Sequence, residues 1–190
     1  MQPTFILLSG LRFSGKNYVA NRITRETGWA QASFADAVKD ECAAQYGLDA
    51  ARLKNDREYK EQHRTKLIEL GNTRRAEDPD YWARRVYDTH NTPGAVYVLC
   101  DYRFPNEAAF LRSMKACVIT VRIQASDDIR RERGWKPDPA VDTDISETSL
   151  LETRPDFLII NDVKDAFMPE MMFVIIAEAS RRRVRMEQLQ

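Results

Sequence analysis

The chain has 190 residues, of which 43% are hydrophobic and 31% charged, which is typical of one globular domain with a full core. Its 29 basic and 29 acidic residues cancel, so net charge does not favour nucleic acid or an anionic membrane as a partner. No apolar stretch is long enough to span a bilayer, and the three cysteines are scattered and lack metal-ligand spacing. We therefore expect one cytoplasmic domain over residues 1–190, with reduced thiols.

The first predicted strand, residues 4–8, leads into Gly10-Leu11-Arg12-Phe13-Ser14-Gly15-Lys16-Asn17, and a helical pattern follows. A strand, a glycine loop and a helix in this order form a phosphate-binding loop, because the glycines let backbone N–H groups turn toward an anion. The helix N-terminus adds partial positive charge, and Lys16 can reach the β- and γ-phosphates of a nucleotide. The alternative is an ordinary strand-to-helix turn.

One position departs from this motif. Asn17 stands where Ser or Thr usually binds Mg²⁺, and an amide oxygen is a weaker ligand for that ion. The departure bears on metal binding rather than on phosphate binding. The residues expected to contact the nucleotide are Gly10, Arg12, Phe13, Ser14, Gly15, Lys16, Asn17 and Tyr18.

The rest of the chain alternates short apolar strands with helical patterns. Strands are predicted at residues 96–100, 118–123 and 157–160, with a weaker one at 30–34. Helices are predicted at residues 16–27, 36–45, 57–75, 79–91, 105–114, 127–133 and 164–183. This alternation predicts a three-layer α/β/α sandwich with a mostly parallel sheet, of the P-loop nucleotide-kinase type. Ligands bind beyond the carboxyl ends of the strands in such sheets.

Two aspartates follow predicted strands at that edge. Asp101 ends the strand at residues 96–100, where a carboxylate can position hydrated Mg²⁺. It can equally cap the next turn, with Arg103 as a surface partner. Asp36 begins a helix, so it is either an N-cap or a group that accepts a hydroxyl proton or orients an acceptor. The pattern leaves both alternatives open.

Basic residues gather in three further places. Lys60 and Arg64 are four residues apart and share a helix face, which by default is a solvated surface. Arg130, Arg131 and Arg133 follow the strand at residues 118–123, where a mobile lid over residues 126–146 could neutralise a transferring phosphoryl group. An exposed loop with mutual salt bridges is the alternative there. The run 181–185 is typical of a solvated helix end, and contact with nucleic acid is the lesser interpretation.

Several of these segments resemble one family. From the first strand to Asp162, the chain resembles P-loop kinases, the group that joins phage deoxynucleoside monophosphate kinases and animal-type phosphomevalonate kinases. The phosphate loop and the Tyr59-Lys60-Glu61 helix fit both branches, as do Ser146-Glu147-Thr148-Ser149-Leu150 and the segment from Phe157 to Asn161-Asp162. Tyr81-Trp82 and the segment from Asp101 to Ala108 resemble the nucleotide kinases, whereas Arg130 with Arg133-Gly134-Trp135 is similar to the phosphomevalonate kinase lid.

That resemblance implies ATP- and Mg²⁺-dependent phosphoryl transfer to a small phosphorylated acceptor. It implies that Lys16 binds the ATP phosphates, that Arg130 and Arg133 cover them, and that Asp101 and Asn17 help to place the ion. On the acceptor side, within residues 36–91 and beyond, the expected phosphate ligands are Lys39, Lys60, Arg64, Arg75 and Arg103.

Four functions compete at this point. A deoxynucleoside monophosphate kinase is the leading hypothesis, because two segments favour it, and phosphomevalonate kinase is the runner-up. A phage-type kinase of a hydroxymethylated base within DNA is a third candidate, opposed by the neutral net charge. A non-catalytic nucleotide-binding module, which Asn17 would permit, comes last, because an arginine-rich lid has little use in a passive binder.

Overall fold

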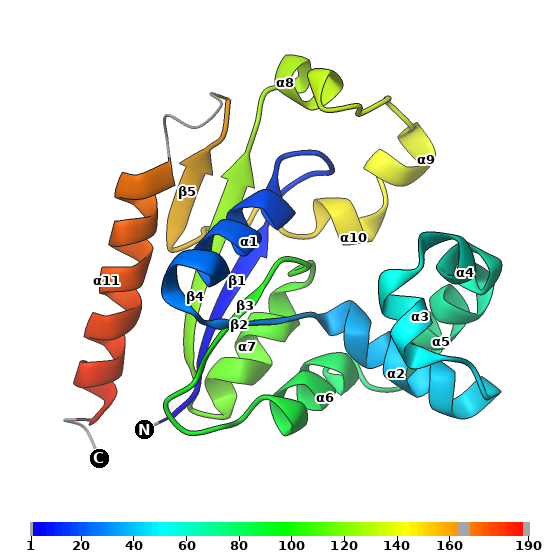
Figure 1. The fold of residues 1–190 in the computed structure, drawn as a ribbon, viewed down its shortest axis with the longest axis horizontal. Coiled ribbons are helices and arrows are strands. Elements are labelled where there is room, and N and C mark those ends of the chain that lie inside the picture. The colour runs from blue at the N-terminus through cyan, green and yellow to red at the C-terminus, as the bar shows by residue number, and fades with distance from the viewer. Residues whose placement is uncertain (1, 163–167, 188–190) are drawn as a thin grey trace.

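The computed structural model describes residues 2–162 and 168–187. A five-stranded parallel sheet lies between two layers of helices (Figure 1). Its strands, in spatial order, are β2 (Ala30–Ala32), β3 (Val96–Leu99), β1 (Thr4–Ser9), β4 (Cys117–Gln124) and β5 (Phe157–Ile160). The predicted three-layer α/β/α fold is thereby confirmed, and the weak strand at 30–34 is present as the short edge strand β2.

The central strand β1 is paired on both sides. Ile6 lies opposite Val98 of β3 and Ile119 of β4, so both neighbours run in the same direction in a fixed register. All four strand pairs are parallel, and the carboxyl ends of the strands therefore meet at one edge. This edge carries the phosphate-binding loop.

Each face of the sheet has its own apolar core. On one face, the buried residues of α1 (Lys16–Thr27) pack with Ile175 and Ala179 of α11 (Met168–Glu187). On the other face, α6 (Tyr81–Thr89) and α7 (Pro105–Ser113) pack with Phe34 and Leu150. The sheet is thus covered on both sides, which explains why its strands are apolar on both faces. The predicted helix at 164–183 begins at Met168 within the described residues.

Four helices form a group that lies outside the three layers, next to α6. It comprises α2 (Phe34–Tyr46), α3 (Ala50–Asn55), α4 (Arg57–Gln62) and α5 (Arg64–Glu77), and Figure 1 shows α3, α4 and α5 on the far side of α2 from the sheet. A small core that includes Cys42, Leu70 and Trp82 fixes it to α6. The indole N–H of Trp82 donates to the Gly71 carbonyl at 3.0 Å, which is the ordinary way to satisfy a buried indole.

The helix predicted at residues 57–75 is interrupted. α4 ends at Gln62, the N–H of the C-cap residue His63 bonds to the Lys60 carbonyl at 3.2 Å, and α5 begins at Arg64. Asp56 caps α4, accepting a hydrogen bond from the Tyr59 N–H. The side-chain pattern alone missed this break, because the chain turns at a residue without a glycine or proline signal.

The predicted lid segment, residues 126–146, consists of short helices rather than one irregular loop. It contains α8 (Asp127–Glu132) and α9 (Pro139–Asp142) and runs into α10 (Ile145–Thr148), all at the carboxyl edge of the sheet (Figure 1). Asp138 and Asp144 provide N-caps for α9 and α10. Within the described ranges, none of the helices has the length and apolar character that a membrane crossing requires.

The packing of β4 gives a test of this core. We expect Ile119→Ala to lower the free energy of unfolding by about 2–5 kcal/mol, because Ile119 is fully buried and truncation leaves a cavity. Urea denaturation followed by circular dichroism measures this change. Ile68→Ala is the matched control: Ile68 is 52% exposed, so its loss should stay within about 0.5 kcal/mol. Equal losses at the two positions would contradict the assigned core.

Candidate active site

Two glycines shape the loop between β1 and α1. Gly10 has a φ of 141° and Gly15 a φ of 101°, both in the region that favours glycine. A β-carbon at Gly10 would overlap the Ile123 carbonyl oxygen, and one at Gly15 would overlap the side-chain nitrogen of Asn161. Larger residues are therefore excluded at both positions by the neighbouring strands β4 and β5, and the loop is held in one shape.

The interior of this loop carries polar groups suited to an anion. The Ser14 hydroxyl is buried and has no hydrogen-bond partner among the residues that the structure describes. Lys16 Nζ donates to the Gly10 carbonyl at 2.6 Å and to the Leu11 carbonyl at 3.0 Å. Burial lowers the pKa of Lys16 to about 8. An ammonium group folded onto carbonyls, beside an unsatisfied hydroxyl and the N-terminus of α1, fits the phosphate chain of ATP.

The lid arginines are fastened to the loop. Arg130 is buried, its Nε donates to the Arg12 carbonyl at 2.9 Å, and its guanidinium lies 3.7 Å from the centroid of the Trp135 ring. Arg133 donates to the Ser14 carbonyl at 3.1 Å and to the Asn161 carbonyl at 2.7 Å. The structure thus brings both expected lid arginines to the phosphate loop, where each is hydrogen-bonded to a backbone carbonyl.

Acidic Asp142 completes this contact. Its carboxylate pairs with Arg12 at 3.4 Å and accepts from the indole N–H of Trp135 at 3.2 Å. The pKa of Asp142 lies below its usual range, chiefly because the Asp138 N–H donates to the carboxylate. The acidic stretch after the lid arginines therefore connects the lid to the loop.

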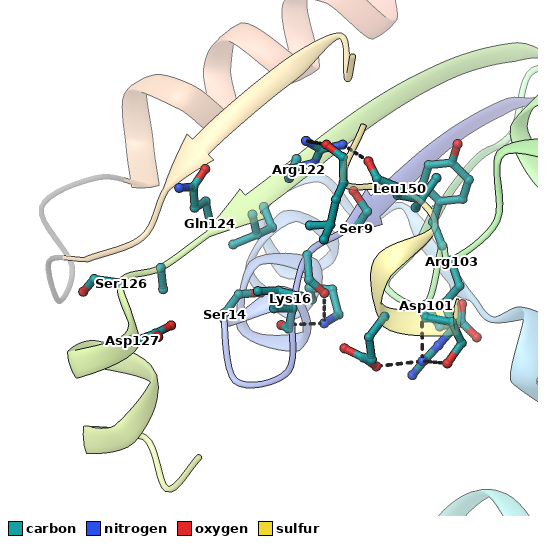
Figure 2. A pocket seen from close by; sticks show the side chains of 18 residues that line it. Ser9, Ser14, Lys16, Asp101, Arg103, Arg122, Gln124, Ser126, Asp127 and Leu150 are labelled. Atoms are coloured by element: carbon teal, nitrogen blue, oxygen red, sulfur yellow. Dashed lines mark hydrogen bonds and ion pairs between the residues drawn. The ribbon is translucent and has the colours of Figure 1, made fainter. Parts of the chain in front are cut away.

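Two cavities meet at Lys16. The first, of about 470 Å³, lies at the carboxyl ends of β1, β3 and β4 under α10, and Figure 2 shows Lys16 between Asp127 on one side and Arg103 on the other. The second, of about 400 Å³, lies between the outer side of the loop and Arg133. Lys16 lines both cavities, and its ammonium contacts two carbonyls, those of Gly10 and Leu11, that belong to residues lining the first. The second cavity is lined by Arg12, Phe13, Gly15, Lys16, Asn17, Tyr18 and Arg133.

Asp101 has a different environment from the one expected of a metal ligand. Its carboxylate accepts hydrogen bonds from the Ser33 hydroxyl at 2.7 Å, the Phe34 N–H at 3.2 Å and the Ala35 N–H at 2.8 Å. It therefore caps the N-terminus of α2 from strand β3, although it also borders the first cavity. Among the described residues there is no cluster of three or more His, Cys, Asp or Glu that could hold a metal ion.

The N-cap interpretation of Asp36 is wrong. Ser33 is the N-cap of α2, and its hydroxyl accepts from the Asp36 N–H at 3.3 Å. The Asp36 carboxylate instead pairs with Lys39 at 2.7 Å. The expected acceptor ligand Lys39 thus has a carboxylate partner one helical turn away.

The remaining acceptor-side cations fall into two groups. Arg103 pairs with Glu147 at 2.8 Å and donates to the Ser146 hydroxyl at 3.0 Å, on the wall of the first cavity. Arg75 stacks over the Phe104 ring at 4.5 Å, and burial lowers its pKa. Lys60 and Arg64 belong to α4 and α5 and line neither cavity, and Arg64 pairs with Glu61 at 2.9 Å.

Three residues near the site did not emerge from the sequence as candidates. Glu147 has a side chain only 7% exposed and neutralises Arg103. Glu107 is buried and accepts from the Arg103 and Phe104 N–H groups, and burial raises its pKa to about 8. Asn161 touches both the loop and Arg133. The sequence signals for Asn161 were its place directly after an apolar strand and the resemblance of the segment from Phe157 to Asp162 to both branches of the family.

The C-terminal arginines have protein partners. Arg181 and Arg182 both pair with Glu178, and Arg182 also reaches Asp156 at 2.8 Å and the Val118 carbonyl at 3.0 Å. The side chain of Arg183 lies outside the described residues. These contacts fix α11 to β4 and to the start of β5.

Comparison with known proteins supports this geometry. The sequence profile described as "Phosphomevalonate kinase" matches residues 8–117, more than half of the chain. A phosphomevalonate kinase of Drosophila melanogaster is 29% identical over 164 residues, covering 82% of this chain and 85% of the relative.

Solved structures share the fold at low sequence identity. A gluconokinase from Sinorhizobium meliloti 1021 superposes with a TM-score of 0.54 at 15% identity, covering 99% of this chain and 98% of that one. Shikimate kinase from Aquifex aeolicus superposes with a TM-score of 0.50 at 16% identity, covering 92% and 98%. The P-loop kinase fold that the sequence predicted is thus confirmed.

The capping contacts of Asp101 can be tested without a metal. We expect Asp101→Asn to lower the free energy of unfolding by about 1–3 kcal/mol in buffer with EDTA, because an amide nitrogen would face donors of α2. Urea denaturation measures the loss, and Asp88→Asn, at an exposed position of α6, is the control. A loss that appears only when Mg²⁺ is present would show that the main role of Asp101 is metal binding.

Proposed function

The chain belongs to the phosphomevalonate kinase family, and we propose that it transfers the γ-phosphate of ATP to the phosphate of phosphomevalonate. The observation that carries this proposal is the family match over residues 8–117, which contains the phosphate loop, Asp101 and Arg103. The enzyme is an ATP-dependent kinase, and the choice of acceptor is the part that we infer.

The phosphate loop and Lys16 are proposed to bind the ATP phosphates. Lys16 would exchange its two carbonyl acceptors for phosphate oxygens, and the Ser14 hydroxyl would gain the partner it lacks. Bound Mg²⁺ would neutralise phosphate charge, with the exposed amide of Asn17 as the nearest side-chain oxygen that the loop motif offers. Ser14 lines the first cavity, Asn17 lines the second and Lys16 lines both, so the proposed phosphate site extends along both sides of the loop.

Transfer then depends on position and charge. Phosphoryl transfer requires that donor and acceptor be aligned and that positive charge surround the transferred group. It needs little covalent chemistry from the protein. Lys16 borders both cavities and Arg133 lies against the loop, so positive charge is present on two sides. The contacts of Arg130 and Asp142 hold the lid segment over the loop and would keep water from the reacting phosphate.

The acceptor is proposed to bind in the first cavity, beside Arg103. An acceptor phosphate would compete with the Glu147 carboxylate for the guanidinium of Arg103, whose side chain is 43% exposed and lines the cavity. The pKa of Arg75 is lowered chiefly by burial and, to a lesser extent, by the positive charge of Arg103. A dianionic phosphate between them would relieve this repulsion.

One of the two segments that favoured a deoxynucleoside monophosphate, Tyr81-Trp82, has a structural role here. Trp82 is 2% exposed within the core around Cys42 and Leu70, and the Tyr81 hydroxyl donates to Glu41 at 2.6 Å. Neither ring lines the first cavity, where the described lining includes one aromatic residue, Tyr102. This arrangement supports a small flexible acceptor over a nucleobase.

An acceptor panel tests the proposal. We expect ATP consumption, measured as ADP release, to depend on phosphomevalonate and to stay at background with deoxynucleoside monophosphates. Lys16→Ala is the control for contaminating kinases, because loss of one electrostatic stabiliser should lower turnover by about two to three orders of magnitude. Faster ADP release with a deoxynucleotide than with phosphomevalonate would replace the proposed acceptor.

The lowered pKa of Lys16 predicts a pH dependence. kcat/KM for ATP reports ionisations of the free enzyme, and above pH 8 the free Lys16 loses the charge that binds phosphate. We therefore expect kcat/KM for ATP to fall about ten-fold per pH unit well above pH 8, while kcat stays level because bound phosphate retains the proton.

Lys16→Arg separates this effect from that of Glu107, whose pKa is also raised to about 8. An arginine keeps its charge throughout this range, so the fall should disappear in the variant even if its activity is reduced. A fall that persists in Lys16→Arg would assign the ionisation to Glu107 or another group.

A further inference from the structure

Asn161 connects three parts of the molecule. It follows β5 and is 5% exposed, and its backbone N–H donates to the Gln124 carbonyl of β4 at 2.7 Å. Its side-chain amide donates to the Ser14 carbonyl at 2.8 Å, and its own carbonyl accepts from Arg133 at 2.7 Å. One buried residue thus ties the sheet edge to both the phosphate loop and the lid.

The contact with Ser14 fixes a peptide plane. Peptide bonds in the described chain are all trans, so the Ser14 carbonyl and the Gly15 N–H point in opposite directions. Two donors, Asn161 Nδ2 at 2.8 Å and Arg133 Nη1 at 3.1 Å, hold this carbonyl on the side of β5 and the lid. The Gly15 N–H is consequently directed away from them.

The Asn161 side chain lies close against the backbone of Gly15. Gly15 has a φ of 101°, and a β-carbon there would overlap the Asn161 amide nitrogen. Glycine at this position is therefore required by the side chain of Asn161 as well as by the loop conformation. A freely rotating glycine peptide has little preference of its own, so an external contact is needed to hold it.

We propose that Asn161 is a positioning residue that orients the Ser14–Gly15 peptide, so that the Gly15 N–H is presented to the nucleotide phosphates. Its backbone carbonyl holds Arg133 against the same loop, which leaves the side chain free to be tested separately. This inference rests on the ATP-binding part of the proposed function and does not depend on the acceptor.

Two substitutions of opposite chemistry test it. Asn161→Ala removes the donor to the Ser14 carbonyl but keeps the backbone contact with Arg133, and we expect the Kd for ADP to rise about ten-fold. Asn161→Asp has nearly the same shape, yet it sets an oxygen against the Ser14 carbonyl, which should turn the peptide over. We expect its Kd to rise further than that of the alanine variant. If Asn161 only filled space, the alanine variant should have the higher Kd for ADP.

A spectroscopic measurement follows the peptide itself. In the wild-type protein, the Gly15 amide proton should move downfield when ADP is added, as the N–H meets a phosphate oxygen. This NMR signature should be lost in Asn161→Ala even at saturating ADP. The NMR measurement does not depend on catalytic turnover. The experiment on the wild-type protein does not depend on whether a variant folds.

Asn106→Ala is the matched control. Asn106 also uses its amide to hold a distant carbonyl, that of Pro79 at 2.6 Å, but far along the chain from the loop. It should lower thermal stability while leaving the Kd for ADP unchanged.

Three outcomes would overturn the proposal: an alanine variant within two-fold of the wild-type Kd, an aspartate variant that binds ADP better than the alanine variant, or no Gly15 shift in the wild type. If the wild type fails to bind ADP at all, the proposed kinase function falls together with this inference. If it binds ADP but does not phosphorylate phosphomevalonate, only the acceptor assignment fails.

Discussion

The parallel pairing of β1 with both β3 and β4 is the constraint on which the site depends. Leu7 lies opposite Leu99, and Leu8 opposite Val121, so the ends of three strands are held side by side. The phosphate loop, the cap on α2 and the lid all start from these ends. β5 also runs parallel to β4. Asn161, which follows β5, therefore lies at the same edge as the phosphate loop.

Local patterns were sufficient to predict this framework. The first helix, residues 16–27, and the last strand, residues 157–160, were predicted with the bounds that the structure shows. Buried parallel strands are continuous apolar runs, and the phosphate loop has its own glycine spacing. Both signals lie within a few neighbouring residues, so they can be recognised without knowledge of the tertiary fold.

Partners that lie far apart in the sequence could not be predicted in this way. The carboxylate of Asp101 meets Ser33, and Arg133 meets Ser14, across 68 and 119 residues respectively. A residue type at a strand end indicates that it can bind something, whereas the fold decides whether that partner is a ligand or a helix terminus. The same limit applies to Glu147, which the sequence indicated only as part of a segment that resembles both family branches, without its partner Arg103.

The contacts of the lid segment have an optical consequence. Trp135 is held between the Arg130 guanidinium and the Asp142 carboxylate, so its indole emission senses two opposite charges that would separate if the lid opened. The other two tryptophans lie elsewhere: Trp82 is in α6, where it packs against α2 and α5, and Trp29 packs against the core that includes α1. Intrinsic fluorescence can therefore follow lid, acceptor-side helices and central sheet as three separate signals, once two of the indoles are replaced by phenylalanine.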